Sequence, residues 1–477
     1  MRLFVLIFAF GLFAAPESYA SQPGVELLNS TLIAKLHMDE TARKGQMVGA
    51  YQIRFRNPGN KPISQVPILL NPGLSITKIV GAGNILLRTT STIEPVEGME
   101  VLELTTALVP LIKPLNKNDH AEIIIHFRGY LEDLSWTGLD GVKDTLNPDF
   151  TMIRAEAFAY PVFASPKITA IKTAMAHKPF FQVAEIELPG ANTIAGSHQI
   201  ANKTITGERT NFTLKNPRPT KLMTLAIAPY QHINEGPVLV SYFAEDKAGA
   251  RQILDAATAE TTRLTRLLGD ANKGALLQIV ALAEGYSSQS ETAIFRDRTF
   301  FANPVLNDKM PVLNDKMKAM ILRMWQTSKD AKAGHWAKGL DAVTSNLFGT
   351  QEEMEAFETT AFAASKALFS ADAALRKTAL SDYVLDGFAA ESDTVSTLGF
   401  AVLYKIMGED DYFSFVRSLR GALNGGYADM ESVAEFMGKN LKHKKARKFA
   451  KNWFINSKAG KDMNKAKSFA DLVSRYK

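Results

Sequence analysis

The chain has 477 residues, of which 46% are hydrophobic and 22% are charged; it contains no cysteine and has a formal net charge of +6. This length exceeds one ordinary hydrophobic core and predicts two to three domains. The composition is that of a folded globular protein and excludes a wholly disordered chain. The absence of cysteine excludes disulfides, zinc-cysteine sites, iron-sulfur ligation and thiol catalysis.

The first 20 residues predict an export signal. Arg2 precedes an almost unbroken apolar run of 13 residues, 3–15, and a small-residue pattern ends at Ala20. This order is typical of a signal peptide cleaved after Ala20, and the run is short for a permanent span of a bilayer of about 30 Å. An uncleaved anchor is the alternative. No other stretch of the sequence is long and apolar enough to cross a membrane, so we expect no transmembrane span after signal removal. A large exported chain without disulfides fits the bacterial periplasm or the extracellular side of a bacterium.

Residues 21–236 are predicted to form a β-rich amino-terminal domain. Short alternating segments such as 49–56 and 121–127 recur, and turn clusters at 57–60 and 71–73 separate them. Many short strands with Pro and Gly turns indicate a sandwich or a saddle-shaped sheet.

The pattern changes at residue 237, which opens a second domain, 237–477. A strand-like segment at 238–243 is followed by a helical periodicity ending at Gly269 and by another strand at 276–282. We expect a mixed lobe over 237–315 and a helical lobe over 316–477, and hence an α+β chain. The heptad 304–310 recurs unchanged as 311–317; because Pro311 would interrupt a helix, we interpret it as a loop insertion.

Positive charge concentrates at the carboxyl end. Residues 439–477 hold 13 Lys or Arg against Asp462 and Asp471, a net charge of +11. One interpretation is an anionic partner, such as a membrane surface or an acidic glycan. The other is the solvated face of terminal helices, which the helical spacing of Phe449, Trp453 and Phe454 favours.

Five segments follow one another along the chain in a recognisable order: IRAEAFAYP (153–161), the stretch 212–230, LGFAVLYKIMGEDDYF (398–413), 430–436 and FAKNWF (449–454). Their order and spacing resemble the aminopeptidase N and leukotriene-A hydrolase family of zinc metallopeptidases, the gluzincins. The resemblance implies a β-rich amino-terminal domain followed by a thermolysin-like, mostly helical domain. It also implies a zinc ion held by two His and a Glu, with a His-Glu-x-x-His helix supplying the two His and the general base.

The zinc motif is absent, because no two of the eight His are four residues apart. If Trp325 matches the Trp that follows the motif, Ala319 and Arg323 replace the two His ligands and Met320 replaces the general base. By the same resemblance Lys338, in HWAKGL (335–340), replaces the third ligand.

The tyrosine that stabilises the oxyanion in the family is also missing, and Ser396 takes its position before Gly399. Ala offers no donor atom, and a zinc ion 4 Å from one positive charge would be repelled by roughly 8 kcal/mol at an effective dielectric near 20. The resemblance therefore implies a degenerate member with no zinc, no other cofactor and no catalytic residues.

Other chemistry is weakly supported. Glu291 is what persists of the family's amine-binding motif, and His335 is a lone candidate base. Arg323 and Lys338 could hold a small anion, although pairing with neighbouring carboxylates is the simpler alternative. No phosphate loop, dinucleotide fingerprint or nucleophile elbow occurs, and we expect no nucleic-acid partner.

Three hypotheses follow for the function. The first is a non-catalytic, aminopeptidase-like protein of the bacterial envelope that binds a peptide, glycan or protein partner. The second is a hydrolase with a rearranged site, and the third is a structural subunit of an envelope complex.

Overall fold

The computed structural model describes residues 24–39, 41–139, 141–190, 192–217, 219–272, 274–288, 290, 292–302, 315–325, 334–383, 388–423 and 430–477. The predicted signal segment, most of the repeated heptads and Glu291 lie outside these ranges. Within them, no helix is both long enough and apolar enough to span a membrane.

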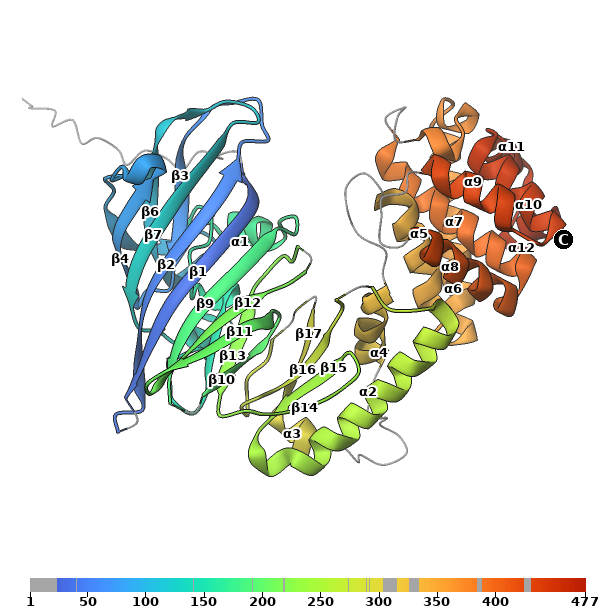
Figure 1. The fold of residues 1–477 in the computed structure, drawn as a ribbon. Helices are drawn as coiled ribbons and strands as arrows, with labels where there is room; N and C mark the ends of the chain where they lie inside the picture. The colour runs from blue at the N-terminus through green and yellow to red at the C-terminus, as the bar shows by residue number, and fades with distance from the viewer. Residues whose placement is uncertain are drawn as a thin grey trace, which may run out of the picture. The chain divides into compact units, whose positions relative to one another are not determined.

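The chain divides into two compact units, each described by itself. Unit 1 comprises residues 1–232, 241–247 and 278–302, and unit 2 comprises residues 233–240, 248–277 and 303–477. Strands dominate the amino-terminal part and helices the carboxyl-terminal part (Figure 1). The predicted fold class, a β-rich domain followed by a mostly helical one, is confirmed. The predicted boundary at residue 236 stays a prediction.

A seven-stranded sheet with the order β11-β12-β9-β1-β2-β7-β4 forms the largest layer of unit 1. Its strands are β1 (Glu26–Asp39), β2 (Lys44–Arg56), β4 (Leu74–Gly81), β7 (His120–Gly129), β9 (Phe181–Pro189), β11 (Gln199–Thr206) and β12 (Arg209–Lys215). In β2 every second residue from Gly45 to Phe55 is buried, the period of a sheet with one face against a core.

Two smaller sheets complete the β-rich region. One has the order β3-β6-β5, with strands β3 (Ile63–Leu70), β5 (Ser91–Val96) and β6 (Met99–Leu115). The other has the order β10-β13-β8, with strands β8 (Thr151–Arg154), β10 (Thr193–Gly196) and β13 (Thr224–Ala228). Side chains from all three sheets and from the short helix α1 (Ile168–Met175) form one core cluster.

A four-stranded sheet follows in the order β14-β15-β16-β17. Its strands are β14 (Gln231–Glu235), β15 (Val238–Tyr242), β16 (Leu277–Leu282) and β17 (Ala293–Asp297). Helix α2 (Lys247–Leu268) connects β15 to β16, and α3 (Arg298–Ala302) follows β17. Gly269 ends α2 with a φ of 79°, as its position in the sequence predicts.

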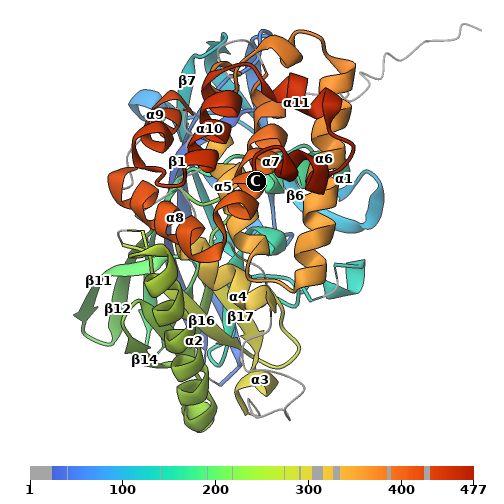
Figure 2. The same ribbon diagram turned by 90° about the vertical axis from the view of Figure 1, so that its right-hand side faces the viewer.

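The rest of unit 2 is helical. Its elements are α4 (Asp315–Leu322), the 3-10 turn η5 (Arg323–Trp325), α5 (Gly334–Asn346), α6 (Gln351–Ala371), the 3-10 turns η6 (Leu375–Lys377) and η7 (Leu380–Asp382), α7 (Ala389–Met407), α8 (Glu409–Leu423), α9 (Met430–Asn440), α10 (Lys444–Ala450), the π-helical turn η8 (Lys451–Ile455), α11 (Ala459–Lys465) and α12 (Phe469–Ser474). Helix α7 contacts α5, α6, α8, α10 and α12 and is the centre of this bundle (Figure 2). Leu398, Phe400 and Leu403 of α7 are fully buried, and the run 398–403 is apolar throughout, as expected for a helical segment that other helices surround.

Candidate functional site

The segment that resembles the zinc helix of the family is short and changes its helical form. Helix α4 ends at Leu322, and Arg323 already belongs to the 3-10 turn η5. Ala319 therefore lies in the last α-helical turn, and the tighter 3-10 winding begins at Arg323. Met320 is half-buried and Arg323 is exposed.

Turn η5 is fixed to the end of α2. The buried indole of Trp325 donates from Nε1 to the carbonyl of Gly269 at 2.7 Å, and the amide of Asn272 donates to the carbonyl of Met324 at 3.0 Å. Leu322, Trp325 and Leu340 line one small cavity, so this segment lies beside α5. The two segments that resemble the ligand-bearing helices of the family are therefore neighbours within unit 2.

Lys338, which the sequence resemblance assigns to the position of the third zinc ligand, forms an ion pair. Its Nζ lies 2.6 Å from Oδ2 of Asp393 on α7. The Lys338 side chain is 53% exposed and that of Asp393 is 31% exposed, so the pair is at the surface. The expectation that a cation here pairs with a neighbouring carboxylate therefore holds for Lys338. Among the described residues, the side chain of Arg323 has no hydrogen-bond or ion-pair partner.

Ser396, which the sequence resemblance assigns to the position of the family's tyrosine, is completely buried and lies against α5. Its Oγ donates to the carbonyl of Asp393 at 3.2 Å. A Cβ added to Gly339 would lie 2.4 Å from Ser396 Oγ and 2.7 Å from the backbone of residues 396 and 397. Helices α5 and α7 thus touch through their backbones, and the structure brings the degenerate positions Lys338 and Ser396 to the same contact.

Asp393 and Gly339 were not predicted from the sequence. Asp393 precedes Ser396 by three residues on α7, close to one helical turn, and this spacing is the one sequence feature that indicates that the two residues lie on the same face of the helix. Gly339 was recognised within the resemblance, but its role as the point of helix contact depends on the packing and has no local signature.

These residues do not fit a zinc ion. The four positions that the resemblance assigns to the metal ligands and the general base hold Ala, Met, Arg and Lys, and Lys338 is already paired with a carboxylate. No three His, Asp or Glu side chains gather in a metal-binding arrangement within the described parts of the chain. His335 lies in α5 near its start, and Glu291 falls outside the described residues.

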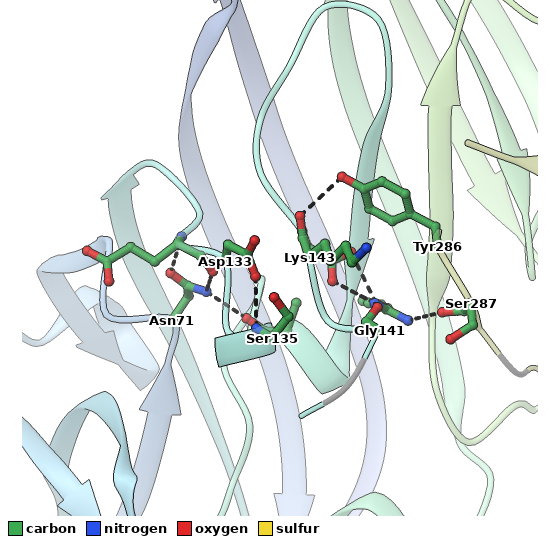
Figure 3. A network of polar contacts seen from close by, with 11 residues as sticks. Asn71, Asp133, Ser135, Gly141, Lys143, Tyr286 and Ser287 are labelled. Carbon is green, nitrogen blue, oxygen red and sulfur yellow. Dashed lines mark hydrogen bonds and ion pairs between the residues drawn. The ribbon is translucent and has the colours of Figure 1, made fainter. Parts of the chain in front are cut away.

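A buried polar network anchors the segment just before Glu291 within unit 1 (Figure 3). The guanidinium of Arg154 donates to the carbonyl of Ser287 at 2.5 Å, to that of Gly141 at 2.7 Å and to the carboxylate of Asp144 at 2.7 Å. Tyr286 donates from its hydroxyl to the carbonyl of Lys143 at 3.1 Å. The loop 141–144, the end of β8 and the segment 286–287 are therefore fixed to one another.

Asp144 and Arg154 are almost inaccessible to water. Burial raises the pKa of Asp144 to about 6, although the charge and the hydrogen bonds of Arg154 act in the opposite direction. The nearby charge of Glu156 adds to the rise. Glu156 is half-buried, and its Oε2 has no hydrogen-bond partner among the described residues. The network holds the backbone of three segments in place.

A buried Ser-His pair also lies in unit 1. Ser197 Oγ lies 2.9 Å from Nδ1 of His198, and Ser197 Oγ accepts a hydrogen bond from the amide of Thr224 at 2.8 Å. Both residues are 0% exposed, and burial lowers the pKa of His198 to about 4. The adjacent Ser and His resemble part of a nucleophile pair, but no substrate reaches them in this packing and the arrangement is structural.

Comparison with known proteins gives structural neighbours only. No protein-family model matches the chain, and no curated protein matches it. Its structural neighbours are M1 zinc metallopeptidases, an aminopeptidase-like group, at low sequence identity. The M1 zinc metallopeptidase of Deinococcus radiodurans is 14% identical with a TM-score of 0.44, and 91% of this chain and 94% of that chain are covered.

Two further solved structures have the same coverage of 91% of this chain and 94% of theirs. A mutant of the Deinococcus radiodurans enzyme bound to a Tyr-Ser-Ala substrate is 13% identical with a TM-score of 0.44. A mutant two-domain M1 zinc metallopeptidase bound to L-arginine is 14% identical with a TM-score of 0.47.

Proposed function

We propose that this chain is a non-catalytic, aminopeptidase-like protein of the bacterial envelope that acts by binding a peptide, glycan or protein partner. The observation that carries the proposal is the ion pair between Lys338 and Asp393. At the position where the sequence resemblance implies an anionic zinc ligand, the chain has a cation, and a carboxylate on α7 already neutralises it at 2.6 Å.

The packing around this ion pair supports the same conclusion. Ser396 replaces the oxyanion-stabilising tyrosine, and its hydroxyl is turned to the backbone of its own helix. Gly339 packs directly against Ser396, so a tyrosine-sized side chain has no room at this contact. This packing supports the proposal that residue 396 supplies no oxyanion-stabilising group.

An open sheet edge favours a peptide or protein as the partner. Among the described residues β11 pairs with β12 on one side only, and seven of its eight residues are exposed. An edge strand presents unpaired backbone groups to which an extended segment of another chain can add. Export to the envelope follows from the amino-terminal segment and is part of the proposal.

The test is elemental analysis of the purified mature protein combined with hydrolysis of a panel of aminoacyl-fluorophore substrates. We expect substoichiometric zinc and no turnover. The Lys338→Glu variant is the matched control, because it returns a carboxylate to the third ligand position while Ala319 and Arg323 still replace the two histidines. One zinc per chain with turnover in the wild type would refute the proposal.

A further inference from the structure

The carboxyl-terminal end of unit 2, residues 439–477, has far more positive than negative charge at its surface. Only two of its 13 Lys and Arg residues form ion pairs with carboxylates of the described chain: Lys439 with Glu435 at 3.3 Å and Arg475 with Asp471 at 3.1 Å. The remaining eleven have no such partner. We refer to residues 439–477 as the basic end.

The two acidic residues of the basic end are engaged locally. Asp462 is half-buried and accepts hydrogen bonds from Nε1 of Trp453 at 3.0 Å and from the hydroxyl of Tyr476 at 2.5 Å. Asp471 accepts from the amide of Lys467 at 2.8 Å, which together with Arg475 lowers its pKa. Neither carboxylate is available to neutralise the lysines of α10.

The basic end is a compact body and not a set of loose helices. Phe449, Trp453 and Phe454 are fully buried, and the rings of Phe449 and Tyr476 meet edge to face at 4.9 Å. The aromatic spacing therefore does mark packed helices. The packing does not bury the charges of α10. Lys444, Lys445 and Lys448 are exposed, whereas the buried face of the same helix consists of Ala446, Phe449 and Ala450.

Cations from other segments join this surface. Lys366 of α6 donates from Nζ to the carbonyl of Ala466 at 2.5 Å. A Cβ added to Gly460 of α11 would lie 2.6 Å from the carbonyl oxygen of Arg376, so the basic turn η6 lies against α11. In Figure 2, α10, α11 and the carboxyl terminus lie on the side of the helical unit that faces the viewer.

We propose that the basic end docks on an anionic lipid surface, where its lysines meet the phosphate headgroups. Eleven of the 13 cations are Lys. The flexible point charge of Lys suits the mobile phosphate groups of a lipid surface, whereas Arg is preferred where one phosphate is bound in a fixed bidentate geometry. The buried aromatic rings leave no stacking platform for nucleic-acid bases. Ile455, 44% exposed between Lys451 and Lys458, supplies an apolar contact for the headgroup region.

This inference goes beyond the proposed function and is independent of it, since it involves neither the degenerate zinc positions nor edge strand β11. It predicts binding that falls as salt rises, because screened charges attract weakly. Each lysine near an anionic bilayer strengthens binding by about fivefold.

The experiment is cosedimentation of the mature full chain with vesicles of phosphatidylcholine alone or with added phosphatidylglycerol. The test variant replaces Lys444, Lys448 and Lys451 with Gln. The control replaces three exposed lysines of unit 1, Lys61, Lys113 and Lys117, with Gln and so has the same net charge. Thermal melts establish that both variants fold.

We expect the wild type to bind only the vesicles that contain phosphatidylglycerol. The affinity for these vesicles should fall roughly a hundredfold in the test variant and change little in the control. Equal losses of vesicle affinity in the two variants, or no loss in the test variant, would show that the basic end is not the docking surface. Absence of vesicle binding together with tight binding to a soluble sulfated or carboxylated glycan would overturn the lipid proposal.

Discussion

Two pairs of a cation and a carboxylate show how burial decides what such a pair does. In unit 1, Arg154 and Asp144 have side chains that are 4% and 0% exposed, and Arg154 also binds two backbone carbonyls. In unit 2, Lys338 and Asp393 have side chains that are 53% and 31% exposed. The first pair is part of the interior, whereas the second lies in water.

The difference matters because the surface pair, not the buried one, stands at the position to which the family resemblance assigns chemistry. A buried pair cannot lose one member without leaving an unpaired charge, so neither residue can be replaced by itself without a large loss of stability. An exposed pair can be exchanged at low cost. Lys338 is therefore at a place where residue identity is weakly constrained by stability.

The largest expected effect comes from breaking the buried pair. In Arg154→Met the carboxylate of Asp144 loses its counter-charge, and the carbonyls of Gly141 and Ser287 lose their donors. We expect unit 1 to lose about 3–5 kcal/mol of unfolding free energy, measured by urea denaturation.

The double variant Arg154→Met/Asp144→Leu separates the unpaired charge from the lost packing. It should recover most of the stability, since both charges leave the interior together. A double variant no more stable than Arg154→Met would mean that the backbone hydrogen bonds, not the ion pair, hold the network.

The next largest effect is a pH dependence of stability, and it comes from a buried group, the imidazole of His198. Burial lowers the pKa of His198 from 6.5 to about 4, so between these values the folded state binds fewer protons than the unfolded state. Stability is therefore complete above the unfolded value and decreases as the pH falls from about 6.5 towards 4, by up to about 3 kcal/mol. Urea unfolding across this range measures it.

His198→Asn is the control, because its amide oxygen can accept the hydrogen bond from Ser197 and does not titrate. Asp144, whose pKa burial raises to about 6, titrates in an overlapping window with the opposite sign. The difference between wild type and variant therefore isolates His198. Parallel stability curves for the two proteins would contradict the prediction.

The sequence predicted the order of the elements well, for physical reasons visible in particular residues. The alternation in β2 and the helix that ends at Gly269 depend on short-range periods and on one backbone conformation, both of which the sequence contains. The strand predicted at 276–282 is β16.

The contacts between elements could not be predicted from the sequence. The pair of Lys338 and Asp393 joins residues 55 positions apart, and the hydrogen bond from Arg154 to Ser287 joins residues 133 positions apart. No local pattern encodes such distances, because they follow from how whole helices and loops pack. The end of α4 at Leu322 was also unforeseen, since the resemblance implies a continuous helix through Arg323.

The smallest expected effect completes the comparison. In a double-mutant cycle of Lys338→Gln and Asp393→Asn, we expect a coupling energy of about 0–1 kcal/mol, because water screens both side chains and holding them in one geometry costs side-chain entropy. Thermal or urea unfolding of the four proteins measures it. A coupling above about 2 kcal/mol would place this pair with Arg154 and Asp144, and its residues would then be structural elements of the helical unit instead of replaceable surface charges.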